Sequence, residues 1–255
     1  MIETNKLTKK YGDLTAVSEL DLKVESGEIF VFLGSNGAGK TTTIKMLTGL
    51  LLPTSGSAEI DGFDVAKSPI EVKKITGYLP DEPFLYNKLT GREFLQFIAY
   101  IRGIQKKRDR IDKFLDLFEL KGSADELIEG YSLGMKKKIA IGAALLHDPK
   151  VLFLDEPTGG LDPKSAKTMK DLLLDIRQRG TTVFMTTHIL EIAERMCDRV
   201  GIIDHGKLIR VGTMDELRQE AQSGSGSLED IFLELTGKTE EQEIAQFLDD
   251  VNDRS

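Results

Sequence analysis

The chain has 255 residues, of which 40% are hydrophobic and 30% charged, a composition typical of a soluble globular protein with a large buried core. No stretch approaches the roughly 20 consecutive apolar residues of a membrane-spanning helix, no signal peptide is found at the N-terminus, and one cysteine, Cys197, excludes an intrachain disulfide framework. Residues 223–255 carry nine acidic and two basic side chains and so hold most of the net charge of −8. The remaining residues are nearly neutral, and because a protein that binds nucleic acid normally carries a basic excess, this charge disfavours a nucleic-acid partner.

Three short strands are predicted in the first 33 residues, at residues 2–7, 14–24 and 29–33. Turn signals lie between them, and the third stretch is apolar throughout, as expected for a buried strand. Tyr11 comes just before the second strand. Its ring could lie flat on an adenine or pack on the sheet, and its position alone does not distinguish the two.

A glycine-rich loop follows the third strand, because residues 34–42 read Gly-Ser-Asn-Gly-Ala-Gly-Lys-Thr-Thr and fit the pattern G-x-x-x-x-G-K-[ST]. Apolar residues recur at helical spacing over residues 44–51, so the loop lies between a strand and a helix. The glycines let backbone N–H groups approach phosphate oxygens, and the helix dipole favours the same anion. Lys40 is expected to contact the β- and γ-phosphates, and the Thr41 hydroxyl to ligate Mg²⁺. An ordinary glycine-rich turn is the alternative, but the length of the match favours a nucleoside-triphosphate site.

Two more strands are predicted at residues 57–60 and 75–79, and the second ends at a Pro-Asp-Glu-Pro sequence that excludes regular structure. Residues 90–146 then read as helices, the third of them at residues 133–146. Because this block separates the phosphate loop from the next chemical motif, we expect an inserted helical subdomain at about residues 88–146. Its first two helices are predicted from apolar stripes, one at Phe94, Phe97, Ile98 and Ile101 and one at Ile111, Phe114, Leu115 and Phe118.

An apolar strand at residues 150–155 ends in two acids, Asp155 and Glu156. Ligands bind at the carboxyl ends of parallel strands, so Asp155 is expected to hold Mg²⁺ beside the phosphate loop. Glu156 is expected to activate a water aimed at the γ-phosphate, and N-capping of a helix is the alternative role for both acids. His188 ends the next strand, residues 181–187, where it could donate to the γ-phosphate or orient that water.

Helices and a hairpin are predicted between residues 162 and 219. Asp162 opens the first helix as its N-cap, with a proline in the first turn. The later elements are helices at residues 189–196 and 214–219 and a hairpin with strands at residues 200–203 and 208–211.

The C-terminal segment begins with a flexible Ser/Gly linker at residues 223–227. A helix follows, and an acidic tail ends the chain. The apolar face of this helix must dock on the body of the chain, on a second copy or on another protein. It consists of Leu228, Ile231, Phe232 and Leu235.

Taken together, these residues resemble the ATP-binding subunit of ATP-binding-cassette (ABC) transporters over roughly residues 1–220, and the ABC ATPase domain is predicted at residues 1–222. Residues 34–42 are similar to its Walker A loop, 151–156 to its Walker B strand with the catalytic glutamate, 158–162 to its D-loop and His188 to its H-loop. The resemblance implies an α/β fold, a P-loop NTPase (RecA-like) core with an N-terminal antiparallel β subdomain and the inserted α-helical subdomain. It also implies ATP and Mg²⁺ as cofactors and three catalytic residues, Lys40, Glu156 and His188. The residues implied to bind ATP are Tyr11 (which matches the aromatic residue that stacks on adenine), Val17, Ser35, Asn36, Gly37, Ala38, Gly39, Lys40, Thr41 and Thr42.

Two departures from the family pattern affect the site. The signature, usually Leu-Ser-Gly-Gly-Gln, is Tyr-Ser-Leu-Gly-Met at residues 131–135, a variant that resembles the bacterial ABC-2-type exporter branch. It keeps Ser132 and Gly134, which the family uses to contact the γ-phosphate across a dimer. Asp81 replaces the glutamine of the Q-loop. Its carboxylate can approach Mg²⁺ but adds charge near the triphosphate, so its role as a metal ligand stays open.

The resemblance implies a head-to-tail pair, of two copies or of two related chains, with two ATP molecules between them. Each ATP would lie on one phosphate loop and contact Ser132, Gly134 and Asp162 of the other copy. A separate transmembrane permease would dock near residues 81–88. The chain would then be the ATP-hydrolysing subunit of a bacterial exporter, in the cytoplasm on the inner face of the membrane, and the permease would choose the transported compound. The alternatives are a soluble ABC ATPase acting on DNA or ribosomes, which a single cassette disfavours, and a regulatory module with weak turnover, which the altered motifs allow.

Overall fold

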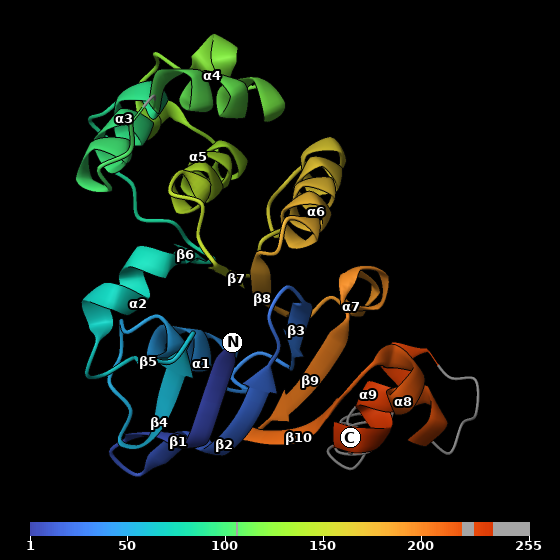
Figure 1. Ribbon diagram of the computed structural model, residues 1–255. Coiled ribbons are helices and arrows are strands. Elements are labelled where there is room, and N and C mark those ends of the chain that lie inside the picture. The colour runs from blue at the N-terminus through green and yellow to red at the C-terminus, as the bar shows by residue number, and fades with distance from the viewer. Residues whose placement is uncertain (106, 221–226, 237–255) are drawn as a thin grey trace, which may run out of the picture.

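The computed structural model describes residues 1–105, 107–220 and 227–236. The strands form two sheets, one of four strands and one of six, and helices cover the larger sheet (Figure 1). Most of the predicted Ser/Gly linker, residues 223–226, and the predicted acidic tail beyond residue 236 lie outside the described residues. None of the helices in the described part of the chain combines the length and the apolar character that a membrane span requires.

The smaller sheet is antiparallel and confirms the predicted N-terminal β subdomain. In the order β2-β1-β4-β5, its strands are β2 (Leu14–Val24), β1 (Ile2–Tyr11), β4 (Ser55–Ile60) and β5 (Phe63–Asp64). β1 continues to Tyr11, beyond the predicted end at residue 7, because backbone pairing with β2 continues although Lys10 and Tyr11 are exposed. The two-residue β5 is too short to give a periodic signal, so it was not predicted.

The larger sheet has the strand order β10-β9-β3-β8-β7-β6 and is parallel except for β10. Every residue of β3, β7 and β8 is buried, as expected for parallel strands covered on both faces. Because β3, β8, β7 and β6 are neighbours and run in the same direction, the residues that follow them meet at one edge of the sheet. The bounds are β3 (Ile29–Leu33), β6 (Thr76–Leu79), β7 (Val151–Asp155), β8 (Thr182–Thr187), β9 (Arg199–Asp204) and β10 (Lys207–Gly212).

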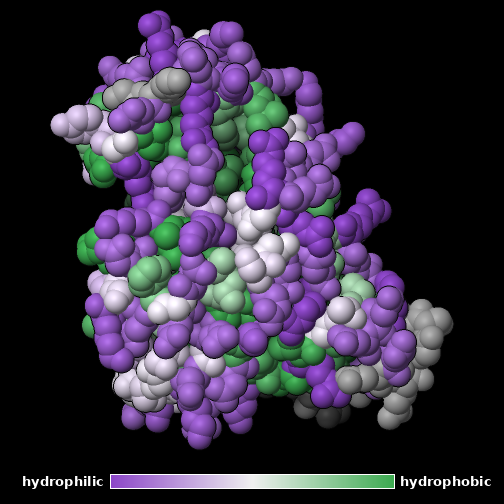
Figure 2. Space-filling view, viewed as in Figure 1, coloured by the Kyte–Doolittle hydropathy of each residue, from purple (hydrophilic) through white to green (hydrophobic). Residues whose placement is uncertain are grey.

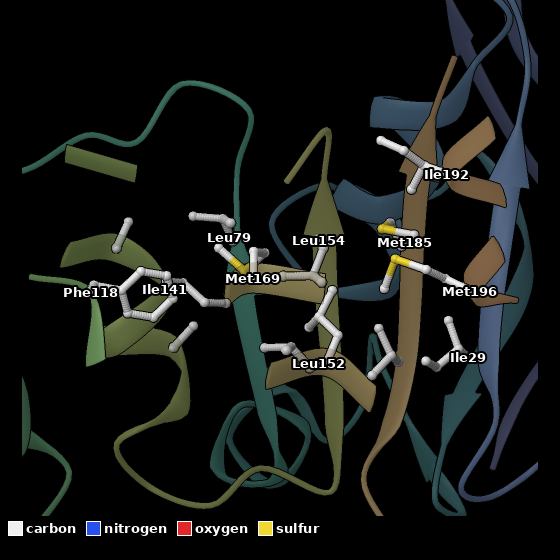
Figure 3. Close-up of a cluster of buried hydrophobic side chains, with 14 of the residues drawn as sticks. Ile29, Leu79, Phe118, Ile141, Leu152, Leu154, Met169, Met185, Ile192 and Met196 are labelled. Atoms are coloured by element: carbon white, nitrogen blue, oxygen red, sulfur yellow. The ribbon is translucent and has the colours of Figure 1, made fainter. Parts of the chain in front are cut away.

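Hydrophobic clusters lie on both faces of the larger sheet. Side chains alternate along β7, so Leu152 and Leu154 belong to the cluster that contains the helices, whereas Phe153 belongs to the cluster shared with the smaller sheet. Figure 3 shows Leu152 and Leu154 in this cluster together with Met169 of α6 (Pro163–Gln178). On the opposite face, Phe153 contacts Phe184, with ring centroids 5.7 Å apart. These two clusters fix the strand ends that carry the site.

The inserted helical block lies beyond the edge of the larger sheet, at the top of Figure 1. It consists of α3 (Gly91–Ile101), α4 (Lys107–Leu117) and α5 (Leu133–Leu145), with two short 3₁₀ turns between the last two. The predicted stripe of α3 is only partly buried, because Phe97 and Ile101 are 38% and 62% exposed. Leu95 and Ala99 are buried with Phe94 instead. The boundaries predicted for the insertion and for the whole ABC domain remain predictions.

The remaining helices are α1 (Lys40–Leu47), α2 (Pro69–Ile75), α7 (Leu190–Met196), α8 (Met214–Glu220) and α9 (Leu228–Thr236). α2 was not predicted. It begins at a Ser-Pro start signal, but Val72 is its one fully buried residue, so no apolar stripe marks it. The strand predicted at residues 75–79 therefore begins at Thr76.

The C-terminal helix α9 docks on the body of this chain, which decides among the three predicted options. Leu228 and Ile231 are buried in the core, and Phe232 and Leu235 pack partly buried against it. The backbone N–H of Leu228 donates to Oε1 of Glu194 at 2.9 Å and so ties α9 to α7. Since α7 follows the His188 segment directly, α9 supports the helix next to the candidate site.

Candidate functional site

The chemically active residues meet at the carboxyl edge of the larger sheet. The loop at residues 34–42 follows β3, His188 follows β8, Asp155 ends β7 with Glu156 next to it, and Asp81 comes shortly after β6. A cavity of about 340 Å³ opens at this edge. Its wall consists of Tyr11, Leu14, Ala16, Asn36, Gly37, Gly39, Lys40, Thr41, Thr42, Asp81, Asp155 and Glu156.

The conformation of the glycine-rich loop requires two of its glycines. Gly37 and Gly39 have φ angles of +81° and +106°, in the left-handed region that favours glycine. A Cβ atom on Gly39 would lie 2.5 Å from the carbonyl oxygen of Ala16 and would clash. α1 begins at Lys40, so the N–H groups of its first turn, which lack partners within the helix, lie at the cavity wall.

Lys40 is a buried cation at this cavity. Its Nζ atom donates to the carbonyl oxygens of Gly34 at 2.7 Å and Ser35 at 3.1 Å, and it lies 4.0 Å from Oε1 of Glu156. Burial lowers the pKa of Lys40, and the negative charges of Glu156 and Asp155 oppose this change. Of the three N–H donors of an ammonium group, one remains for a phosphate oxygen.

Oxygen ligands for a divalent cation are present at the same cavity, from Thr41, Asp155 and Asp81. Asp155 is 2% exposed, and the hydroxyl of Thr186 donates to its Oδ1, which orients the carboxylate. No group of three or more His, Cys, Asp or Glu side chains that could hold a metal occurs among the described residues. The donor set nevertheless fits Mg²⁺, which binds through one or two carboxylates together with substrate phosphates and water.

Both carboxylate oxygens of Glu156 are held in place. Oε1 lies 2.9 Å from Nδ1 of His188, and Oε2 accepts a hydrogen bond from the hydroxyl of Thr187 at 3.1 Å. The Glu156 side chain is 14% exposed, whereas that of His188 is 55% exposed. An oriented, nearly buried carboxylate beside an accessible imidazole can bind a water and accept its proton.

Tyr11 reaches the cavity from the smaller sheet, at the end of β1. Its ring is 49% exposed, and Nζ of Lys9 lies 5.3 Å from the ring centroid, a cation–π contact. A half-exposed ring at the cavity wall favours stacking on a base over packing on the sheet. Val17, which was predicted to bind ATP, is fully buried, and the wall beside Tyr11 is formed by Leu14 and Ala16.

Ser132, Gly134 and Asp162 lie outside the wall of this cavity, at the starts of two helices. The hydroxyl of Ser132 accepts a hydrogen bond from the N–H of Met135 at 3.2 Å and caps α5. Asp162 caps α6, and hydrogen bonds from the side chain and backbone of Ser165 lower the pKa of Asp162 to about 2. Because Asp162 caps α6, Asp155 and Glu156 are not its caps, and both line the cavity instead.

One buried charge beside the site was not predicted. Lys137 of α5 is 1% exposed, and its Nζ donates to Oδ1 of Asp81 and to the carbonyl oxygens of Glu156 and Gly159. A signal for its burial was present in the sequence, because the helix face that Lys137 shares is apolar at spacings of three, four and seven residues. Those neighbours are Ala140, Ile141 and Ala144.

Comparisons with known proteins show the family of this chain. The sequence pattern of the ABC transporter family matches residues 17–159. The chain is 44% identical over 220 residues to the bacitracin transport ATP-binding protein BcrA of Bacillus licheniformis. This match covers 86% of this chain and 72% of that protein. It is 38% identical over 240 residues to the probable multidrug ABC transporter ATP-binding protein YbhF of Escherichia coli (strain K12), and there the match covers 92% of this chain and 41% of that protein.

Two solved structures have a similar fold. An ATP-binding subunit of an ABC transporter matches with a TM-score of 0.87 and 32% identity, over 92% of this chain and 99% of that one. The ATP-binding cassette MJ0796, solved as a dimer in a post-hydrolysis state with ADP and Pi bound, matches with a TM-score of 0.77 and 25% identity, over 84% of this chain and 99% of that one.

Proposed function

The chain belongs to the ABC transporter family and is an ATP-binding subunit that hydrolyses ATP, and from this premise we propose that it drives a bacterial exporter whose membrane-spanning permease is a separate chain. The observation that carries the proposal is the meeting of the phosphate loop, Asp155 and Glu156 at one cavity, with His188 bonded to Glu156. The relatives named as transport ATP-binding proteins favour this function over an ATPase that acts on DNA or ribosomes.

In this proposal the phosphate loop and Lys40 bind the β- and γ-phosphates of ATP, and Tyr11 stacks on the adenine. Thr41 and Asp155 hold Mg²⁺, which neutralises phosphate charge when bound. The burial of Lys40 and Asp155 supports these roles, because charge interactions are stronger where water is excluded.

Glu156 acts in the proposal as the base that accepts a proton from the attacking water. The hydrogen bond to Glu156 uses Nδ1 of His188, so Nε2 is the ring atom left for the substrate. A neutral ring then offers Nε2 as an acceptor that orients the water, whereas a doubly protonated ring donates from Nε2 to the γ-phosphate. Both roles predicted for His188 are therefore compatible with one geometry and differ by one proton.

Two copies pair head to tail in this proposal, so that the ATP bound to one copy is completed by Ser132, Gly134 and Asp162 of the other. The N-terminus of α5, which carries Ser132 and Gly134, supports this arrangement, since backbone N–H groups at a helix start bind phosphate. The similar cassette MJ0796, solved as a dimer with ADP and Pi bound, also supports pairing of two copies.

The permease is proposed to dock on the flank of the helical block, which places the chain at the inner face of the membrane. A cavity of about 320 Å³ lies there, and its lining includes Phe84, Phe94 and Ile98. Phe84 is 96% exposed, and Ile101 nearby on α3 is 62% exposed. Figure 2 shows hydrophobic side chains at the surface of this block among mostly hydrophilic ones. Exposed apolar groups of this kind mark contact surfaces, and the position agrees with the docking site predicted near residues 81–88.

Substitution of Lys40 tests the site. Lys40→Ala is expected to abolish ATP binding and hydrolysis, because it removes the buried cation of the loop. Lys45→Ala is the matched control, since Lys45 is exposed on the same helix. Steady-state phosphate release that is the same in the two variants would refute the site.

Co-purification with a hydrophobic membrane protein would support the exporter role, and salt-sensitive binding of nucleic acid would contradict it.

A further inference from the structure

Lys137 places a charged group inside the protein beside the ATP site. Its Nζ atom donates to Oδ1 of Asp81 at 3.1 Å, to the carbonyl oxygen of Glu156 at 2.8 Å and to that of Gly159 at 2.9 Å. An ammonium group has three N–H donors, and all three are used here. Burying a charge is costly unless it is paired and hydrogen-bonded, so this side chain is held where it is by its partners.

The first consequence concerns the backbone at Glu156. This residue has a φ angle of +48°, in the left-handed region that non-glycine residues seldom adopt. In that conformation the carbonyl oxygen accepts from Lys137 while the carboxylate contacts His188 and Thr187. Such backbone conformations persist only where the surroundings impose them, and the bond from Lys137 is one such constraint.

The second consequence concerns the charge of Asp81. The side chain of Asp81 lines the ATP cavity and is 56% exposed, while one of its oxygens is bound to Lys137. An unpaired carboxylate at this wall would repel the phosphates of ATP. The ammonium of Lys137 cancels that charge, so the pair presents a neutral polar group to the cavity, with one carboxylate oxygen still available.

We propose that Lys137 is a positioning residue of the ATPase site: it fixes the backbone that aims the carboxylate of Glu156, and it neutralises Asp81 so that the cavity accepts a triphosphate. Lys137 touches neither ATP nor the attacking water in this proposal and acts through Glu156 and Asp81. The inference rests on the proposed function and adds to it a residue that connects α5 with the loops after β6 and β7.

The two effects separate kinetically. Lys137→Met removes the charge and the three donors, so we expect kcat to fall by about tenfold or more and KM for ATP to rise by about threefold or more. Adding Asp81→Asn removes the unpaired negative charge. KM of the double variant should therefore return to within about twofold of the wild-type value, while kcat stays low because the two carbonyl groups still lack their donor. A purely structural role of Lys137 predicts no recovery of KM.

Lys136→Met is the matched control, because it removes the same charge one position earlier on α5. The Lys136 side chain makes no hydrogen bond or ion pair with any residue that the structure describes. A Lys137→Met protein whose kcat lies within about twofold of this control, or a double variant whose KM stays raised, overturns the proposal.

Two further variants keep the test decisive. If Lys137→Met does not fold, as judged by circular dichroism, Lys137→Gln replaces it, since its amide keeps N–H donors without the charge. Its KM should rise by about threefold, and an unchanged KM overturns the proposal. Lys40→Ala is assayed in parallel. Hydrolysis by Lys40→Ala would refute the ATP site itself, whereas an inactive Lys40→Ala beside a fully active Lys137→Met would refute only the role of Lys137.

Discussion

Replacing Glu156 by glutamine tests the proposed general base with little change in shape. The amide keeps the length of the side chain and can still contact His188 and Thr187, which hold the carboxylate at 2.9 and 3.1 Å. It cannot accept a proton from water. General-base catalysis contributes about 10²- to 10⁴-fold, so kcat of Glu156→Gln is expected to fall by about that factor.

Nucleotide affinity should change in the opposite direction. Oε1 of Glu156 lies 4.0 Å from Nζ of Lys40. Two unit charges at that distance interact by about 4 kcal/mol at an effective dielectric constant of about 20. The substitution removes this competing anion from Lys40 and also its repulsion of the γ-phosphate. If a third of that energy is recovered on binding, ATP should bind about tenfold more tightly.

The assay combines three measurements on one protein. Phosphate release at saturating Mg-ATP gives kcat, titration with a fluorescent ATP analogue gives Kd, and size-exclusion chromatography with ATP detects the expected trapped dimer. Glu126→Gln is the control, since Glu126 is exposed in the helical block. A Glu156→Gln protein that retains more than about a tenth of the wild-type kcat would refute the general-base role. One that stays monomeric at saturating ATP would contradict the head-to-tail pair for the isolated subunit.

Four other predictions concern the phosphate loop and the burial of single side chains. Gly39→Ala should weaken ATP binding by about tenfold or more, because the added Cβ would lie 2.5 Å from the Ala16 carbonyl oxygen, and an unchanged titration would contradict the loop geometry. Burial lowers the pKa of His147, so the free energy of unfolding should fall as pH drops below the ordinary histidine value of 6.5, and His147→Gln should remove this dependence in urea titrations at several pH values. Leu228→Ala should destabilise the docked α9 by about 2 kcal/mol or more, detected as faster hydrogen exchange in that helix, and unchanged exchange would contradict its packing. Burial raises the pKa of Cys197 to about 12, so a thiol reagent at neutral pH should react slowly until the protein is unfolded, and rapid labelling of the native protein would contradict the burial.

The parts of the site that local patterns encode were predictable from the sequence. The spacing of its glycines and Lys40 predicts the phosphate loop. The ends of apolar strands predict the positions of Asp155, Glu156 and His188. Parallel strand order then brings them together, as the structure confirms for the fold. The caps at Ser132 and Asp162 were predictable for the same reason, because capping depends on a few consecutive residues.

The contacts that tertiary packing decides were not predictable. Thr186 and Thr187 orient Asp155 and Glu156, but threonine is common in strands and gives no signal of that role. The exposed side of α3 is apolar in sequence, so its periodicity alone could not show that Phe97 faces outward. The apolar helix face of Lys137 indicates its burial, but its three acceptors come from segments distant in the chain, so these hydrogen bonds could not be predicted.

The position of α5 suggests how the helical block and ATP hydrolysis depend on each other. Ser132 caps this helix, and Lys137 follows five residues later, about 7.5 Å along the axis. In the proposed pair, the start of α5 therefore contacts the other copy's ATP while its second turn holds Glu156 and Asp81 of its own site. A helix of this length moves as a rigid unit, so any shift of the block that displaces Ser132 also displaces Lys137. A permease docked on the flank of the same block would then alter both sites through one helix, without contacting either ATP.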